Sequence, residues 1–166
     1  MSQDDPVMRA ATPADAAAVW SILAPVIRAG ETYALPRDMS EADALAYWLG
    51  GDRQTFVAVR DARIVGTYFL RPNQAGGGSH VANCGYVTDA AREGRGIARA
   101  MCAHSLRMAR DAGFRAMQFN FVVATNDRAV GLWRSMGFEV IGRQPEAFLH
   151  PEHGYVDALV MHRALS

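Results

Sequence analysis

The sequence has few of the features that define several large protein classes. It holds only two cysteines, too few for a disulfide framework or a four-thiolate zinc site. Its 17 basic and 17 acidic side chains give a formal net charge of zero, so a general nucleic-acid-binding protein is not expected. No apolar run approaches the roughly 20 residues of a membrane-spanning helix. We therefore expect no nucleic acid, no membrane and no metal among its partners.

Length and composition instead predict one globular domain. The chain has 166 residues, of which 50% are hydrophobic and 20% are charged, and this is enough for a single buried core. We take the domain as residues 1–166, with its core at about 7–164. The first six residues are acidic and polar, unlike a secretory signal, so a cytoplasmic location is the default expectation.

Hydrophobic periodicity predicts alternating strands and helices. The expected fold class is α/β with a mixed sheet, in the order β-α-α-β-β-β-α-β-α-β-β. Segments 73–79 and 143–154 are predicted loops. Predicted strands cover residues 7–10, 55–59, 64–70, 81–88, 116–124, 138–142 and 155–163, and predicted helices cover residues 13–29, 41–49, 97–112 and 126–136.

The most informative stretch joins the predicted strand at 81–88 to the helix that begins at Ile97. A strand that enters a helix through a glycine turn leaves the first helical N–H groups unpaired, and these groups can bind an anion. Gly94 and Gly96 would let a phosphate approach the main chain, and Arg92, Arg95 and Arg99 add positive charge. The alternative is an ordinary turn with solvated arginines.

The glycine spacing separates this turn from the two best-known nucleotide motifs. A Walker loop would need a Lys-Ser/Thr pair after its last glycine, and none is present. A dinucleotide-binding fold would need three glycines near its first strand, and these are missing too. The stretch resembles the pyrophosphate-binding turn of the GCN5-related N-acetyltransferases (the GNAT family), Arg/Gln-x-x-Gly-x-Gly/Ala. The sequence departs from the family pattern at the first position, where Glu93 replaces Arg or Gln. We expect Arg92, one residue earlier, to offset this negative charge in part. The pattern falls on Glu93, Gly94, Arg95, Gly96, Ile97 and Ala98.

A second motif lies about thirty residues further on. Asn126-x-x-Ala129-x-x-Leu132-Trp133-x-x-x-Gly137-Phe138 is similar to the C-terminal signature of the same family. The resemblance covers roughly residues 7–164, with its strong motifs between 81 and 138. It implies a single-domain GNAT fold with a splayed central sheet. It also implies that acetyl-coenzyme A lies between the strands at 81–88 and 116–124 and leaves as coenzyme A.

The resemblance implies a set of cofactor-binding residues. The backbone of Val87 and Thr88 would pair with the pantetheine arm, and Asn126 would meet that arm or order a water. Trp133 stands where the family usually has Tyr. An indole N–H cannot act as a practical acid, so the alternative to a chemical role for Trp133 is packing in the core. The expected cofactor-binding set is Val87, Thr88, Glu93, Gly94, Arg95, Gly96, Ile97, Ala98, Arg99, Asn126 and Trp133.

Acyl transfer needs a neutral amine and hydrogen-bond donors for the oxygen that gains charge. Free N–H groups at the splayed end of a strand could supply such donors. The expected catalytic residues are Asn126, Asn120 and Tyr86. Tyr86 or a water could assist the leaving thiolate, although a thiol of pKa about 8.5 does not require an acid. His80 could be the base that deprotonates the amine, or it could be an exposed side chain without a role.

The acceptor side is predicted from a narrower resemblance. Residues 119–145 look like the corresponding part of the fungal azetidine-2-carboxylate acetyltransferases, which implies that Asn83 and Asn120 hold the carboxylate or amine of the acceptor. Asparagine is unfavourable within a strand, so its amide should bind another group, such as the acceptor. The alternative is an amide that is hydrogen-bonded within the protein and has no role in binding. Glu31 and Tyr33 could line the acceptor pocket by family analogy.

These observations predict an acetyl-coenzyme A-dependent N-acetyltransferase that modifies the amine of a small molecule, such as an amino acid or its analogue. Two alternatives stay open: a non-catalytic sensor of acyl-coenzyme A, and an enzyme that modifies protein N-termini or lysines. A homodimer is possible, since small enzymes of this fold often pair.

Overall fold

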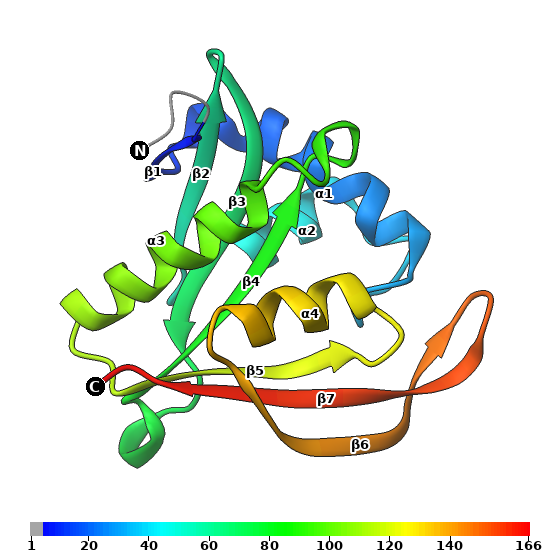
Figure 1. Cartoon of the computed structure of the whole chain (residues 1–166). Coiled ribbons are helices and arrows are strands. Elements are labelled where there is room, and N and C mark those ends of the chain that lie inside the picture. The colour runs from blue at the N-terminus through cyan, green and yellow to red at the C-terminus, as the bar shows by residue number, and fades with distance from the viewer. Residues whose placement is uncertain (1–4) are drawn as a thin grey trace.

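A computed structural model describes residues 5–166 and contains one seven-stranded mixed sheet (Figure 1). Its strand order is β1-β2-β3-β4-β5-β7-β6. None of the helices within the described residues is long and apolar enough to cross a membrane. The strands are β1 (Val7–Ala10), β2 (Gln54–Arg60), β3 (Arg63–Pro72), β4 (Val81–Thr88), β5 (Ala116–Val123), β6 (Glu139–His150) and β7 (Gly154–Ala164). The α-helices are α1 (Ala16–Ala29), α2 (Glu41–Leu49), α3 (Ile97–Asp111) and α4 (Asp127–Ser135).

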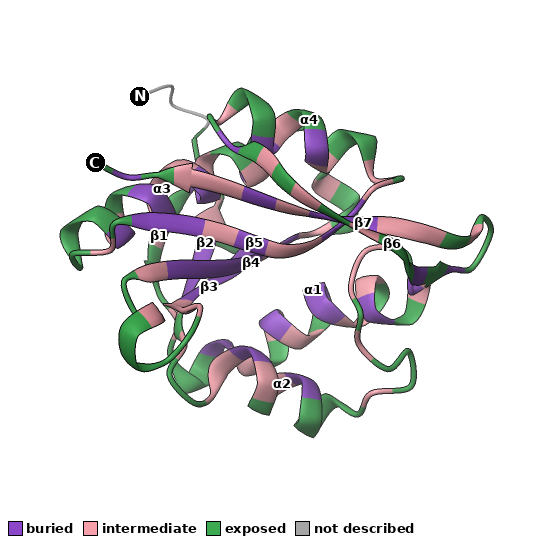
Figure 2. Ribbon diagram, turned by 90° about the horizontal axis from the view of Figure 1, so that it is seen from below, coloured by how far each residue is buried: buried purple, intermediate pink, exposed green. Residues whose placement is uncertain are grey.

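Two pairs of helices cover opposite faces of the sheet (Figures 1 and 2). Helices α1 and α2 pack on β2, β3 and β4 through a core that includes Val19, Trp48 and Phe69. Helices α3 and α4 pack on the other face, where Met101 and Trp133 belong to a larger core. Each helix has one apolar stripe, so burying these stripes requires a sheet between the two pairs.

The centre of the sheet is open. Strands β4 and β5 are parallel but pair only at Val81 with Ala116 and at Ala82 with Met117. Beyond these residues the strands part, and we call the region between them the fork. A parted pair leaves backbone N–H and C=O groups that need other partners. The predicted fold class and splayed sheet are confirmed.

Local signals account for the ends of α1. Thr12 and Asp15 form a capping box around a short 3-10 turn, Pro13–Asp15, that leads into the helix. Gly30 ends the helix with φ of 65°, a conformation that glycine adopts at little cost. Arg37 then returns to the end of α1 and donates from Nε to the Arg28 carbonyl at 2.9 Å. The loop between α1 and α2 is therefore tied back to the end of α1.

The prediction of a loop at 143–154 was wrong, because β6 continues to His150. Pro145 has no N–H and Glu146 has φ of 47°, features that argue against a strand in the sequence. The structure accommodates them as an irregularity in the β6–β7 pairing. Asp157 on β7 accepts from the Glu146 N–H at 2.9 Å and from Arg143 at 2.7 Å, and both contacts lower its pKa. A cross-strand carboxylate thus replaces the missing ladder bonds.

Candidate active site

The glycine turn presents unpaired main-chain donors at the start of α3. Gly94 and Gly96 have φ of 78° and 75°, and no side chain caps the helix. A Cβ built at Gly96 would meet nothing within 4 Å, so the space in front of this backbone is open. An uncapped helix N-terminus beside open space fits a diphosphate. The turn therefore has the features expected for the cofactor's pyrophosphate.

Glu93, the residue that departs from the family pattern, has a cationic partner. Its carboxylate lies 3.1 Å from Arg128 Nη1 at the start of α4. Both side chains are more than half exposed, so we expect this ion pair to add little stability. Arg92 instead lies 3.9 Å from Asp89. Arg128 was not identified from the sequence, because its motif leaves that position unspecified.

The other predicted residues of the turn contribute differently from one another. Arg99 points at α4, where it donates to the Ser135 hydroxyl at 2.8 Å, and Ile97 is buried in the core. Arg95 is exposed, and Ala98 is half-buried. The groups that this turn could offer to an anion are thus mainly the backbone N–H groups of residues 94–98.

Within the fork, the backbone of Tyr86 is bound by one side chain. The Tyr33 hydroxyl accepts from the Tyr86 N–H at 2.9 Å and donates to the Tyr86 carbonyl at 2.9 Å. Backbone groups alternate in direction along a strand, so those of Thr88 also face the fork and those of Val87 face β3. Of the two predicted pantetheine partners, only Thr88 therefore presents its backbone to the fork.

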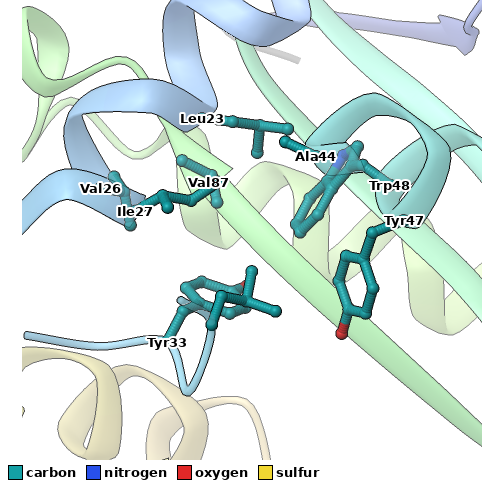
Figure 3. Close-up of a pocket in the computed structure, with 9 residues that line it drawn as sticks. Leu23, Val26, Ile27, Tyr33, Ala44, Tyr47, Trp48 and Val87 are labelled. Atoms are coloured by element: carbon teal, nitrogen blue, oxygen red, sulfur yellow. The ribbon is translucent and has the colours of Figure 1, made fainter. Parts of the chain in front are cut away.

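Tyr33 reaches β4 from the α1–α2 loop. Burial of its hydroxyl raises the pKa of Tyr33 well above its usual range. Its ring packs edge-on against Trp48 at a centroid distance of 6.0 Å. Beside it is an apolar cavity of about 10 Å³, around which side chains of α1, α2 and β4 converge (Figure 3). A cavity of this size holds at most one water, so it is not the acceptor pocket.

The side chain of Tyr86 points away from the fork, toward α3. Its hydroxyl lies 2.7 Å from the Ser105 hydroxyl, which in turn donates to the Cys102 carbonyl at 2.7 Å. Burial raises the pKa of Tyr86 well above its usual value. The proposed role of its hydroxyl stays a prediction, and the structure brings its backbone, rather than its hydroxyl, to the fork. His80 is exposed at the start of β4.

Trp133 is a buried packing residue of α4. It is 8% exposed, and its ring lies 5.0 Å from those of Tyr86 and Phe119. Asn126 caps the same helix through its Oδ1, which accepts from the Ala129 N–H at 3.2 Å. Within residues 5–166 no hydrogen-bond partner is found for Asn126 Nδ2. This amide group is thus held by the cap with its donors available.

The predicted acceptor residues Asn83 and Asn120 belong to one amide network on the face opposite α3 and α4. Asn83 Nδ2 donates across the fork to the Gln118 carbonyl at 2.9 Å. Asn120 Nδ2 donates to Asn73 Oδ1 at 2.6 Å, and its Oδ1 accepts from Gln118 Nε2 at 3.0 Å. Gln144 on β6 also donates to the Asn120 carbonyl at 2.8 Å. Both asparagines are therefore fixed by hydrogen bonds to neighbouring side-chain or backbone groups.

The sequence did not reveal every member of this network. Gln118 and Asn120 occupy alternate positions of β5, so they share one face of the strand. Asn73 and Gln144 lie in segments predicted as loops, so nothing indicated that they meet Asn120. Glu31, predicted for the acceptor pocket, is exposed just after α1, and no hydrogen bond joins it to the described residues.

Comparison with known proteins places the sequence in a recognised group. Residues 20–138 match the family model described as the Acetyltransferase (GNAT) family. A relative from Schizosaccharomyces pombe, N-acetyltransferase aca1, is 33% identical over 98 residues. That match covers 58% of this chain and 47% of the relative, so the chain spans about half of the relative's length.

Solved structures resemble the whole domain. A GCN5-related N-acetyltransferase from Kribbella flavida is 43% identical, with a TM-score of 0.92 over 96% of this chain and 98% of its own. A GNAT superfamily phosphinothricin acetyltransferase from Sinorhizobium meliloti, solved in complex with AcCoA, is 20% identical, with a TM-score of 0.85 over 98% of this chain and 89% of its own. The second likeness concerns the fold alone.

Proposed function

Because this chain belongs to the GNAT family of acetyltransferases, we propose that it acetylates the amine of a small molecule, such as an amino acid or an amino-acid analogue. Acetyl-coenzyme A is the acetyl donor. Two relatives support a small acceptor by name only: the Sinorhizobium meliloti structure and a second solved structure are both described as phosphinothricin acetyltransferases.

One observation carries the proposal: uncapped backbone donors at the turn and backbone groups in the fork lie along the same strand-to-helix path. The turn at 94–98 binds the diphosphate through N–H groups, and the Thr88 backbone continues that line of polar groups into the fork. The bound donor supplies an acetyl thioester whose thiol is a good leaving group. The groups that bind along this path belong to the backbone, so Glu93 is compatible with binding.

The Tyr86 N–H is the residue group best placed to stabilise the oxygen that gains charge. It points into the fork and is held rigidly by the β3–β4 ladder. In the structure it is bound by Tyr33, whose hydroxyl both accepts and donates at that residue. The Tyr33 hydroxyl must therefore release the Tyr86 N–H before an acyl oxygen can accept from it.

The acceptor is proposed to enter from the side of the amide network. Three segments meet there: the residues after β3, the middle of β5 and the β6 strand, joined through Asn73, Asn120 and Gln144. Neighbouring groups already use both amide functions of Asn120 and the Nδ2 of Asn83. We propose that these asparagines shape the acceptor site and present its polar surface.

Thiol release from acetyl-coenzyme A, measured with a thiol reagent across a panel of small amines, tests this function. The protein's own thiols should not interfere, because burial raises the pKa of Cys84 and of Cys102 to about 12. The chain also contains no lysine, so acetylation of its own lysine side chains cannot consume the donor. Calorimetric titration with acetyl-coenzyme A, without an amine, provides a separate measurement of binding.

The outcomes separate the candidate functions. Binding with amine-dependent thiol release is expected. Binding without release from any amine would favour the sensor, and release only with peptides would favour a protein-modifying enzyme. Absence of binding would reject the fork and the turn as a cofactor site.

A cytoplasmic location and a homodimer stay predictions. A dimer contact should be sought at the exposed side chains of Leu149 and Tyr155, which lie opposite each other on β6 and β7.

A further inference from the structure

Two arginines on the acceptor side of the sheet have no acidic partner among residues 5–166. Arg53 and Arg71 are both half-buried, and neither belongs to an ion pair. Arg53 Nε is buried and has no hydrogen-bond partner in the described part of the chain. A partly desolvated cation without a counter-ion is unfavourable unless another group pairs with it. These guanidinium groups are therefore candidates for binding an anion from outside the chain.

The same aromatic ring orients both side chains. The guanidinium carbons of Arg53 and Arg71 lie 5.0 Å and 5.9 Å from the ring centroid of Phe69, and Arg53 also lies 4.4 Å from the ring of Tyr47. Phe69 is 3% exposed and packs edge-on against Trp48, so the ring is a fixed support. Stacking of this kind reduces the freedom of a guanidinium group without using its N–H donors.

Arg71 is also tied to the predicted acceptor residue Asn83. The two residues are opposite each other in the β3–β4 ladder, and Arg71 Nε donates to Asn83 Oδ1 in a long hydrogen bond of 3.5 Å. Asn83 Nδ2 is bound to the Gln118 carbonyl, so the amide cannot turn freely. The terminal nitrogens of Arg71 have no hydrogen-bond partner within the described residues. Asn83 thus acts as a positioning residue for a guanidinium group with free donors.

The location of these cations separates them from the cofactor's diphosphate. Asn83 precedes Thr88 by five residues, which is roughly 16 Å along a strand, and the glycine turn lies beyond Thr88. The distance from Asn83 to the Tyr86 N–H is shorter, roughly 10 Å along the strand. Phe69 lies opposite Gly85, immediately before Tyr86. An anion at Arg71 would therefore belong to the acceptor molecule.

We propose that Arg71, supported by Asn83 and Phe69 and flanked by Arg53, binds a carboxylate or similar oxyanion of the acceptor. The acceptor is then an amine that also carries an acid group, and its amine faces the acyl group near Tyr86. A planar guanidinium suits a carboxylate because two parallel N–H groups can bind its two oxygens. This inference rests on the proposed function, and it specifies that the acceptor carries a negative charge that Arg71 binds.

Matched acid and amide acceptors test the proposal. A panel of amino acids, with proline and azetidine-2-carboxylate among them, is compared with the corresponding carboxamides by thiol release from acetyl-coenzyme A. The ratio of kcat/KM for acid to that for amide is measured in the wild type, in Arg71→Gln and in Arg71→Lys. Arg63→Gln is the matched control, because Arg63 is exposed at the far end of β3 and forms no ion pair with any residue from 5 to 166.

The wild type should prefer acids, and Arg71→Gln should lower the acid-to-amide ratio by about tenfold to a hundredfold, mainly through the KM of the acid. Arg71→Lys should lose less, because it keeps the charge but not the planar fork. The KM of acetyl-coenzyme A and turnover of the amide report that the variants are folded. An unchanged ratio in Arg71→Gln, or a wild type that prefers amides, would overturn the inference. Acetylation of neither member of any pair would instead contradict the proposed function.

Discussion

The two ends of the fork are built from different parts of the polypeptide. At the glycine turn, the groups that we propose to bind the diphosphate are backbone N–H donors of consecutive residues, and nearby side chains such as Arg99 and Ile97 point elsewhere. At the acceptor end, the polar surface consists of side chains from β3, β4, β5, β6 and a loop, held by one another. A backbone site should tolerate side-chain changes, whereas an interlocked side-chain site should not.

The largest effect is expected at Gly85, which supports the acceptor end. A Cβ there would lie 2.7 Å from the ring of Phe69 and 3.2 Å from the Tyr33 hydroxyl, and neither buried group can move without disturbing its own packing. Gly85→Ala should lower the free energy of unfolding by about 1–3 kcal/mol in urea denaturation. Gly77→Ala is the control, because a Cβ at Gly77 meets nothing within 4 Å. Equal stability of the two variants would show that this end is loosely packed.

The glycine turn should respond to a methyl group but not to a charge change. Gly96 has a positive φ, and its missing Cβ faces open space, so Gly96→Ala adds strain and a methyl group at the anion site. Calorimetry should detect acetyl-coenzyme A affinity reduced on the order of tenfold, or about 1.4 kcal/mol. Gly131→Ala on α4, also without neighbours, serves as control. Glu93→Gln should change affinity less than threefold; a larger loss would mean that side chains matter at this end too.

Asn126 follows β5 and caps α4, and its roles as a cap and as a hydrogen-bond donor can be tested separately. Asn126→Ala should lower the free energy of unfolding by about 1 kcal/mol, because it leaves the Ala129 N–H without its acceptor. Asn126→Asp keeps that acceptor but removes the Nδ2 donors. We expect near-wild-type stability with kcat/KM reduced about fivefold in the Asp variant. Full activity in Asn126→Asp would assign the residue to the cap alone.

Tyr33, in the α1–α2 loop, reaches the backbone of the fork through its hydroxyl. Removing its hydroxyl in Tyr33→Phe frees both backbone groups of Tyr86. Acetyl-coenzyme A should then bind about threefold tighter, since no protein group competes for the Tyr86 N–H. Tyr47→Phe is the matched control, because Tyr47 lines the same cavity and its hydroxyl has no hydrogen-bond partner within residues 5–166. Weaker binding in Tyr33→Phe would show that the hydroxyl does not block the site.

The sequence predicted the glycine turn and the helix that follows it because their determinants are local. Gly94, Gly96 and the start of α3 lie within a few residues of one another, and the helical stripe that carries Trp133 follows from periodicity. The order of strands and helices is local information too, and it was sufficient for the fold class. The prediction from local sequence failed at 143–154, because Pro145 lacks an N–H and Glu146 has a positive φ, and both features are unfavourable in a strand. Asp157, eleven residues after Glu146, is what allows β6 to continue.

Only the tertiary structure decided the acceptor end. Tyr33 binds Tyr86 from 53 positions away, Asn73 binds Asn120 from 47, and Gln118 binds Asn83 from 35. No spacing in the sequence can indicate such pairs, because each depends on where a loop returns to the sheet. The sequence also could not show that Arg53 and Arg71 lack counter-ions among residues 5–166, since pairing depends on which charges folding brings together. Backbone donors are fixed by a short motif, whereas side-chain surroundings are fixed by the whole fold.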